Sequence, residues 1–102
     1  MSTQAIVKTK VTPNLDLKEP PLYRVIYLND NVTTVEFVVE SLVKVFGCNL
    51  DEATMITQKI HEEGSATVDV LPYEVAEQKG IEVTQMARNN GYPLNIKIEP
   101  DE

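Results

Sequence analysis

Three side chains of this sequence are suited to hold a positively charged group: the neighbours Asn29 and Asp30, and the single histidine, His61. An amide oxygen, a carboxylate and the lone pair of a neutral imidazole are all hydrogen-bond acceptors, whereas an ammonium group offers donors only. The three residues therefore form a candidate cation-binding set. The set works only if the fold brings two segments that are distant in the sequence together.

Each of these residues also has a simpler interpretation. Asn, Asp and Asn in succession at 29–31 favour a turn, because their side chains bond to nearby backbone. The next residues, Thr33-x-x-Glu36, match a capping box at the start of a helix. His61 alone is typical of a partly exposed histidine near a helix end, where a cation is mildly favoured. Residue types leave both interpretations open.

Catalytic and metal-dependent chemistry has weaker support. Asp30, Glu36 and His61 make up a conceivable acid–base set, and a small hydrolase that uses Asp30 and His61 is a further alternative, but nothing in the sequence indicates a substrate. One histidine and one cysteine, Cys48, are too few for a structural zinc site. Neither a nucleophile motif nor a glycine-rich phosphate loop is recognisable. We therefore expect a protein that is not an enzyme and that needs neither a metal nor a cofactor.

Length and composition limit the number of domains, the partners and the location that can be expected. A chain of 102 residues with 42% hydrophobic residues is enough for one domain with one core. A net charge of -7 argues against nucleic acid as a partner. No apolar run reaches the roughly 18 residues of a membrane span, and residues 1–21 contain no secretory signal. With a single cysteine, these features predict a cytoplasmic protein without a membrane partner, and nothing calls for more than a monomer.

Hydrophobic periodicity divides the chain into an arm and a core. Residues 1–21 show no period and end in Pro20-Pro21, which predicts a flexible N-terminal arm before a core domain at 22–102. Strands are predicted at 23–28, 66–70 and 94–99. Helices are predicted at 35–46, from the capping motif at 49–52 to Gly64, and from Pro72 to the turn at 89–91.

The predicted order is β-α-α-β-α-β. At this size it indicates an α+β domain with three helices on one face of a three-stranded antiparallel sheet. The inner face of the third helix is predicted to consist of Val75, Ala76, Val83, Met86 and Ala87. Gly80 lies inside that helix, where it costs stability and often permits close approach of another element.

Several motifs together resemble the ClpS adaptor family over about residues 20–99. The longest is Tyr23-Arg24-Val25-Ile26-Tyr27-Leu28-Asn29-Asp30-Asn31-x-Thr33-x-x-Glu36-Phe37-Val38. The others follow in the family's order: His61-x-x-Gly64, Glu74-Val75-Ala76-Glu77-x-Lys79 and Ala87-Arg88-x-x-x-x-Pro93-Leu94. The fold that this resemblance implies is three helices on a three-stranded antiparallel sheet, related to the C-terminal domain of the ribosomal stalk protein.

The resemblance also implies a function. Members of that family bind N-degrons, which are proteins with a bulky hydrophobic first residue (Leu, Phe, Tyr or Trp) and a free α-amino group. They deliver these proteins to the ClpA-type unfoldase of the ClpAP protease. The alternative is a module of the same fold that docks on the unfoldase and changes its substrate choice without binding N-terminal residues.

The family's functional positions can be carried over residue by residue. By this resemblance Asn29, Asp30 and His61 hold the α-amino group and the first peptide unit of the ligand. The hydrophobic pocket corresponds to Leu28, Thr33, Val35, Val38, Thr57, Ile60 and Leu94. Glu74 and Lys79 match the unfoldase interface, and the arm at 1–21 matches the extension that the unfoldase engages.

Four positions depart from the common family pattern. Val35 stands where a methionine usually acts as a gate against β-branched side chains, so specificity among apolar first residues is open. Thr57 replaces a frequent apolar residue, which would make the pocket floor more polar and favour Tyr or Trp. Asn31 stands where Asp is frequent, and Pro72 replaces a capping residue before the third helix.

Overall fold

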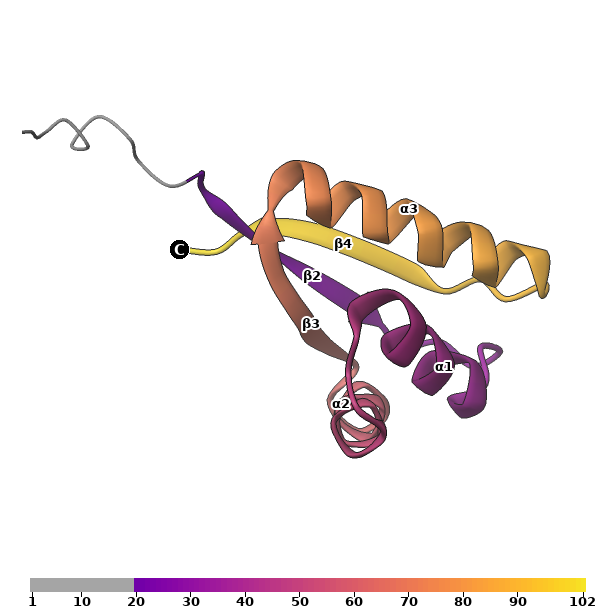
Figure 1. The fold of residues 1–102 in the computed structure, drawn as a ribbon. Coiled ribbons are helices and arrows are strands. Elements are labelled where there is room, and N and C mark those ends of the chain that lie inside the picture. The colour runs from indigo at the N-terminus through magenta and orange to yellow at the C-terminus, as the bar shows by residue number, and fades with distance from the viewer. Residues whose placement is uncertain (1–19) are drawn as a thin grey trace, which may run out of the picture.

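A three-stranded antiparallel sheet with three helices packed against it forms the fold, which a computed structural model describes for residues 20–102 (Figure 1). The elements in chain order are β2 (Leu22–Leu28), α1 (Val35–Phe46), α2 (Leu50–Glu63), β3 (Ser65–Pro72), α3 (Tyr73–Asn89) and β4 (Asn95–Pro100). The predicted order and fold class are confirmed. The predicted arm at 1–21 lies outside the described residues, except for its last two prolines.

Strand β2 lies in the middle of the sheet, between β3 and β4, and is antiparallel to both. Its Val25 and Tyr27 are completely buried under the helices. Its last residue, Leu28, pairs with Ser65 of β3 and with Asn95 of β4. The carboxyl end of β2 is therefore fixed from both sides, just before the loop that carries Asn29 and Asp30.

The core contains one polar pair that the sequence pattern does not reveal. The Tyr27 hydroxyl and Ser41 Oγ are 2.8 Å apart, and Ser41 Oγ donates to the Val38 carbonyl at 2.8 Å. Because Ser41 has one hydroxyl hydrogen and that hydrogen goes to Val38, Tyr27 is the donor to Ser41. Burial raises the pKa of Tyr27 well above its ordinary value, so the phenol stays neutral. This pair joins β2 to α1.

The start of α1 corrects one prediction. The capping residue is Thr34, not Thr33, because Thr34 Oγ1 accepts the Phe37 amide hydrogen at 3.1 Å. Thr33 is part of the preceding turn, where its hydroxyl donates to Asp30 Oδ2 at 2.7 Å. The position three residues after the cap is Phe37 rather than Glu36, so the predicted capping box at 33–36 is wrong.

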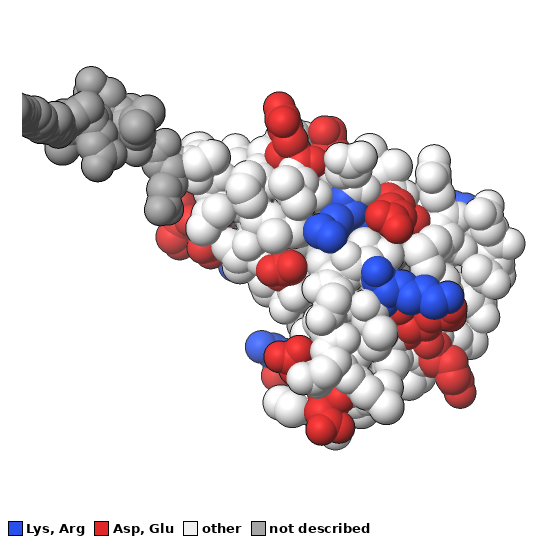
Figure 2. Space-filling model, in the orientation of Figure 1, with Lys and Arg blue, Asp and Glu red and all other residues white. Residues whose placement is uncertain are grey.

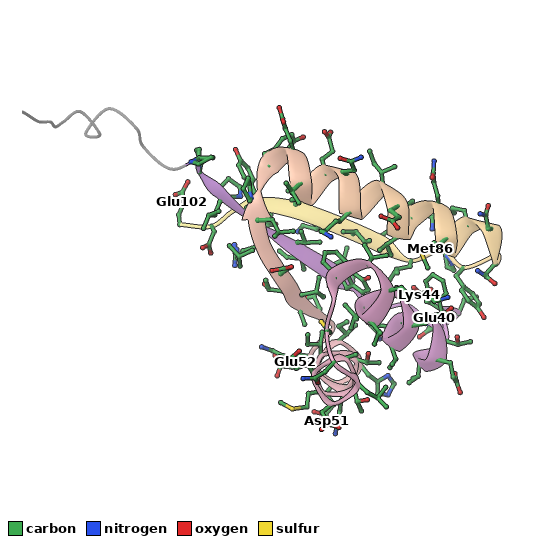
Figure 3. All side chains as sticks on the ribbon, in the orientation of Figure 1. Glu40, Lys44, Asp51, Glu52, Met86 and Glu102 are labelled. Atoms are coloured by element: carbon green, nitrogen blue, oxygen red, sulfur yellow. The ribbon has the colours of Figure 1, made fainter. Side chains whose placement is uncertain are left out.

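The second capping motif is confirmed. Asn49 Oδ1 accepts the Glu52 amide hydrogen at 2.8 Å, and Glu52 Oε1 accepts the Asn49 amide hydrogen at 3.1 Å. Asp51 and Glu52 lie in the first turn of α2 (Figure 3), where the helix dipole stabilises negative charge. The helix ends at Gly64, whose φ of 91° is left-handed, as the pattern predicted.

The inner face of α3 differs from the prediction at Val75, which is 41% exposed. The buried residues are Ala76, Gly80, Val83 and Ala87, which recur every three to four positions, and Met86 is half-buried against the core. Val75 precedes Ala76 by one position, and one step turns the side chain by about 100° around the helix axis. Strand β3 also runs to Pro72, beyond the predicted end at residue 70.

One face of the molecule carries its basic side chains next to acidic ones, and the basic side chains form no patch of their own there (Figure 2). On α1, Lys44 Nζ and Glu40 Oε2 are 2.6 Å apart (Figure 3). Among residues 20–102, no helix combines the length and apolar character that crossing a membrane requires.

Gly80 of α3 faces β4. A Cβ built there would lie 3.7 Å from Ile98 Cδ1 and 3.8 Å from Ile96 Cγ2, which are ordinary van der Waals distances. The site thus has room for a methyl group. Glycine inside a helix costs up to about 1 kcal/mol relative to alanine, because the unfolded chain loses more conformational freedom.

We predict that Gly80→Ala raises the free energy of unfolding by about 0.5–1 kcal/mol, measured by urea denaturation. The matched control is Gly47→Ala, because Gly47 ends α1 with a φ of 72°. There alanine should lower the free energy of unfolding by about 1–2 kcal/mol. A loss of stability in Gly80→Ala would show that the α3–β4 contact is tighter than these distances indicate.

Candidate functional site

A cavity of about 260 Å³ lies where the loop after β2 meets α1 and α2. It has a polar side and an apolar side, and these come from two distant segments of the chain. The residues that line it are Asn29, Asp30, Asn31, Thr33, Val35, Val38, Thr57, Ile60 and His61. The predicted acceptors from residues 29–30 and from residue 61 therefore face one cavity.

One backbone hydrogen bond explains how the two segments meet. The Asn29 amide donates to the Gly64 carbonyl at 2.9 Å, directly after Leu28 pairs with Ser65. His61 precedes Gly64 by three residues, so it lies in the last turn of α2. The loop after β2 is thereby attached to the end of the helix that carries the imidazole. His61 itself is exposed at the cavity rim.

Asp30 is held in place by its own turn. Its Oδ1 accepts the amide hydrogens of Val32 at 2.8 Å and Thr33 at 2.7 Å, and its Oδ2 accepts the Thr33 hydroxyl hydrogen at 2.7 Å. Partial burial raises the pKa of Asp30, but the hydrogen bonds from Thr33 and Val32 outweigh it and lower the pKa below its ordinary value. The side chain is therefore a fixed carboxylate at neutral pH.

These bonds leave capacity for a ligand. An ionised carboxylate has about four acceptor positions, and the turn occupies three of them. The remaining position is on Oδ2, which accepts only the Thr33 hydroxyl hydrogen in the described structure. The turn interpretation and the ligand interpretation of Asp30 are thus compatible, because the turn orients an oxygen that still has a lone pair.

The apolar side of the cavity comes from the two helices. Val38, Thr57 and Ile60 are 7%, 6% and 3% exposed, so they form a fixed wall. Val35, at the first position of α1, is 57% exposed and stands at the rim. The hydroxyl of Thr57 donates to the Ala53 carbonyl at 2.7 Å. An apolar side chain placed here would be removed from water.

Of the ten residues predicted to bind the ligand, eight line this cavity and two do not. Leu28 is half-buried at the end of β2, and Leu94 is 1% exposed in the main core. Asn31 also lines the cavity, although the sequence analysis assigned it no role in binding. Its position beside Asn29 and Asp30 in the sequence is the feature that could have indicated this. Glu36 lines a different hollow on α1, so of the conceivable acid–base set only Asp30 and His61 share the cavity.

The two residues matched to the unfoldase interface lie on α3, which contributes no lining residue to the cavity. Glu74 is exposed in the first turn. Lys79 is half-buried: its Nζ donates to the Val45 carbonyl at 2.8 Å and lies 5.8 Å from the centre of the Phe46 ring. Lys79 therefore also attaches α3 to the end of α1.

Other hollows in the described residues lack this combination of groups. The hollow beside Glu74, of about 500 Å³, is larger, and its walls are mostly proline, tyrosine and valine side chains. In residues 20–102, no three side chains of His, Cys, Asp or Glu gather in a way that could hold a metal ion. The cavity at 29–61 is the candidate site because several acceptors and an apolar wall meet there.

Comparisons with known proteins agree on one family. The family model of the "ATP-dependent Clp protease adaptor protein ClpS" matches residues 18–97. The ATP-dependent Clp protease adapter protein ClpS of Nautilia profundicola is 46% identical over 92 residues, which are 90% of this chain and 95% of that protein. The protein of the same name from Acetivibrio thermocellus is 41% identical over 101 residues, 99% of this chain and 100% of its own.

A solved structure shows the same fold with a ligand. It is ClpS2 of Agrobacterium tumefaciens bound to L-phenylalaninamide, with a TM-score of 0.78 and 37% sequence identity, and the match covers 81% of this chain and 100% of that one. The family match, the relatives that span nearly the whole sequence and this shared fold show that the chain belongs to the ClpS family of ATP-dependent Clp protease adaptor proteins.

Proposed function

We propose that this chain is an adaptor that binds N-degrons through a free α-amino group and a bulky hydrophobic first residue, and delivers them to a ClpA-type unfoldase. The observation that carries the proposal is the two-sided cavity, in which Asn29, Asp30 and His61 lie on the polar side. A protein N-terminus has the matching form, since an ammonium group and a side chain leave the same carbon atom.

The chemistry of the two sides fits that ligand. The ammonium group donates to the Asn29 amide oxygen, the free position of the Asp30 carboxylate and the neutral His61 ring. Each charge-assisted hydrogen bond contributes on the order of 1.5–3 kcal/mol, and burial of a Leu or Phe side chain contributes a similar amount. Association costs at least about 4 kcal/mol. Binding is therefore expected to be micromolar or weaker, which suits a ligand that must be passed on.

The ligand of the solved relative has the same features. L-phenylalaninamide, which ClpS2 of Agrobacterium tumefaciens binds, combines an α-ammonium group, an aromatic side chain and an amide in place of the first peptide bond. At 37% identity and with the same fold, that protein supports the assignment of such a ligand to this chain.

The unfoldase would dock away from the cavity. Glu74 and Lys79 lie on α3, and the large hollow of Pro20, Pro21, Tyr23, Pro72, Tyr73 and Val75 adjoins Glu74. A first residue can then occupy the cavity while α3 contacts the partner. Because the ammonium of Lys79 already binds the Val45 carbonyl, Glu74 is the better residue for testing the interface without disturbing the fold.

The first prediction concerns the first residue of the ligand. Peptides that differ only there should bind when it is Leu, Phe, Tyr or Trp, and fail when it is Glu, Lys or acetyl-Leu. Fluorescence anisotropy measures this directly. Acetylation removes the ammonium charge and two donors, so a loss of at least tenfold is expected. No preference among the peptides, whether all bind equally or none binds, would instead support a module that docks on the unfoldase without binding N-terminal residues.

The second prediction separates the charge of Asp30 from its turn. Asp30→Asn keeps an oxygen that can accept the amide hydrogens of Val32 and Thr33, but it removes the charge. We expect affinity for a Leu-first peptide to fall about 10- to 100-fold, the effect of one charge-assisted hydrogen bond. The matched control is Asp69→Asn, because Asp69 accepts a backbone amide hydrogen from Val70 at 2.8 Å but does not line the cavity. Unchanged affinity in Asp30→Asn would leave the turn as the residue's only role.

The third prediction concerns pH. Lowering the pH from about 7.5 to 5.5 protonates histidine side chains, and a protonated imidazole neither accepts a hydrogen bond nor tolerates a nearby ammonium. The lowered pKa of Asp30 keeps its carboxylate ionised over this range. Peptide affinity should therefore fall with pH in the wild type and stay flat in His61→Gln. A pH-independent affinity in the wild type would exclude His61 as an acceptor.

A further inference from the structure

Thr57 is the polar residue on the apolar side of the cavity. It is 6% exposed, and its neighbours on that side are Val35, Val38 and Ile60. The other polar lining residues come from the loop at 29–33 or, in the case of His61, from the last turn of α2. A hydroxyl in such a wall is unusual, because an apolar side chain would line the pocket without needing a hydrogen-bond partner.

The hydroxyl of Thr57 has already used its hydrogen. It donates to the Ala53 carbonyl at 2.7 Å, one turn earlier in α2. A hydroxyl has one donor hydrogen and two acceptor lone pairs. The hydrogen of Thr57 is thus bound without a ligand, and its oxygen can still accept a hydrogen bond.

The position of Thr57 relative to His61 defines where that acceptor lies. The two residues are four positions apart on α2, so they share one face and are separated by about 6 Å along the helix axis. If an ammonium group is held at the His61 end, we expect the ligand side chain to run along α2 toward Thr57. The far edge of an aromatic ring is then expected at the level of Thr57.

We propose that Thr57 is a specificity residue that makes the cavity favour first residues with a donor on an aromatic ring, the phenol of Tyr and the indole N–H of Trp, over Phe. The inference rests on the proposed function, since it concerns the ligand of the same cavity. The phenol O–H or indole N–H donates to Thr57 Oγ1, while Thr57 keeps its hydrogen bond to the Ala53 carbonyl. Phe fills the same space and leaves the Thr57 lone pairs unused.

The preference is tested with amino-acid amides that compete for a fluorescent Leu-first peptide. L-tyrosinamide is compared with L-phenylalaninamide and with 4-fluoro-L-phenylalaninamide, which extends the ring at the same position but has no donor. The wild type should bind the tyrosine compound about two- to tenfold more tightly than either of the others, the range that one neutral hydrogen bond supports. Equal affinity for the tyrosine and fluorophenylalanine compounds would overturn the proposal.

Variants then assign the preference to the hydroxyl. In Thr57→Val, which keeps the branched shape, the ratio of tyrosine to phenylalanine affinity should fall to about one, while binding of the phenylalanine compound persists. Thr57→Ser should retain the preference. The matched control is Thr54→Val, because the Thr54 hydroxyl donates to the Leu50 carbonyl at 2.8 Å in the same helix but lies outside the cavity. A ratio unchanged in Thr57→Val would contradict the proposal.

Failure of the two proposals gives different results. If none of the compounds or N-terminal peptides binds the wild type, the proposed adaptor function is wrong, and the role of Thr57 is wrong with it. If all bind through a free α-amino group but without a donor preference, the adaptor function stands and only the role of Thr57 is lost.

Discussion

The site depends on the fixed position of the end of β2. Leu28 pairs with β3 on one side and with β4 on the other, and the next amide, of Asn29, donates to the Gly64 carbonyl. Because Gly64 ends α2, this bond attaches the loop after β2 to the helix that carries Thr57, Ile60 and His61. Together with the pairing of Leu28 and Ser65, this bond brings two segments that are distant in the sequence to one cavity.

The two sides of the cavity are stabilised in different ways. The apolar wall is an extension of the core, since Val38 and Ile60 belong to the same buried cluster as Val25 and Leu42. The polar side is a self-contained turn in which Asp30 binds backbone and side-chain hydrogens of residues 32 and 33. The turn presents oriented oxygens at the rim, where a ligand's ammonium can be bound without leaving water completely. A cavity built this way needs little rearrangement when a ligand enters.

Much of the fold could be predicted from the sequence, because the hydrophobic periodicity and the capping residues indicate the same helix boundaries. Glycines at 47 and 64 end helices where the pattern predicts, and Asn49 caps α2 as expected. The choice of Thr34 over Thr33 as the capping residue could not be predicted, because both are threonines and threonine caps helices well. It depends on Asp30, whose turn occupies the Thr33 hydroxyl.

The candidate site was less predictable from the sequence than the helices and strands were. Residue type suggested Asn29, Asp30 and His61 as acceptors, but their meeting depends on a backbone bond between Asn29 and Gly64 that has no sequence signature. Family resemblance assigned Leu28 and Leu94 to the pocket, whereas the structure places one at a strand end and the other in the main core. Asn31 was noted only as part of the turn and as a departure from the family pattern, and its place in the cavity lining comes from the structure.

The central claim is that two distant segments form one ligand site, and NMR titration of the ¹⁵N-labelled protein with L-phenylalaninamide tests it directly. The account predicts that amide signals of residues 29–33 and 57–61 shift together and give one dissociation constant, while those in the first turn of α3 stay in place. Shifts confined to one of the two segments, or centred on α3, would contradict it.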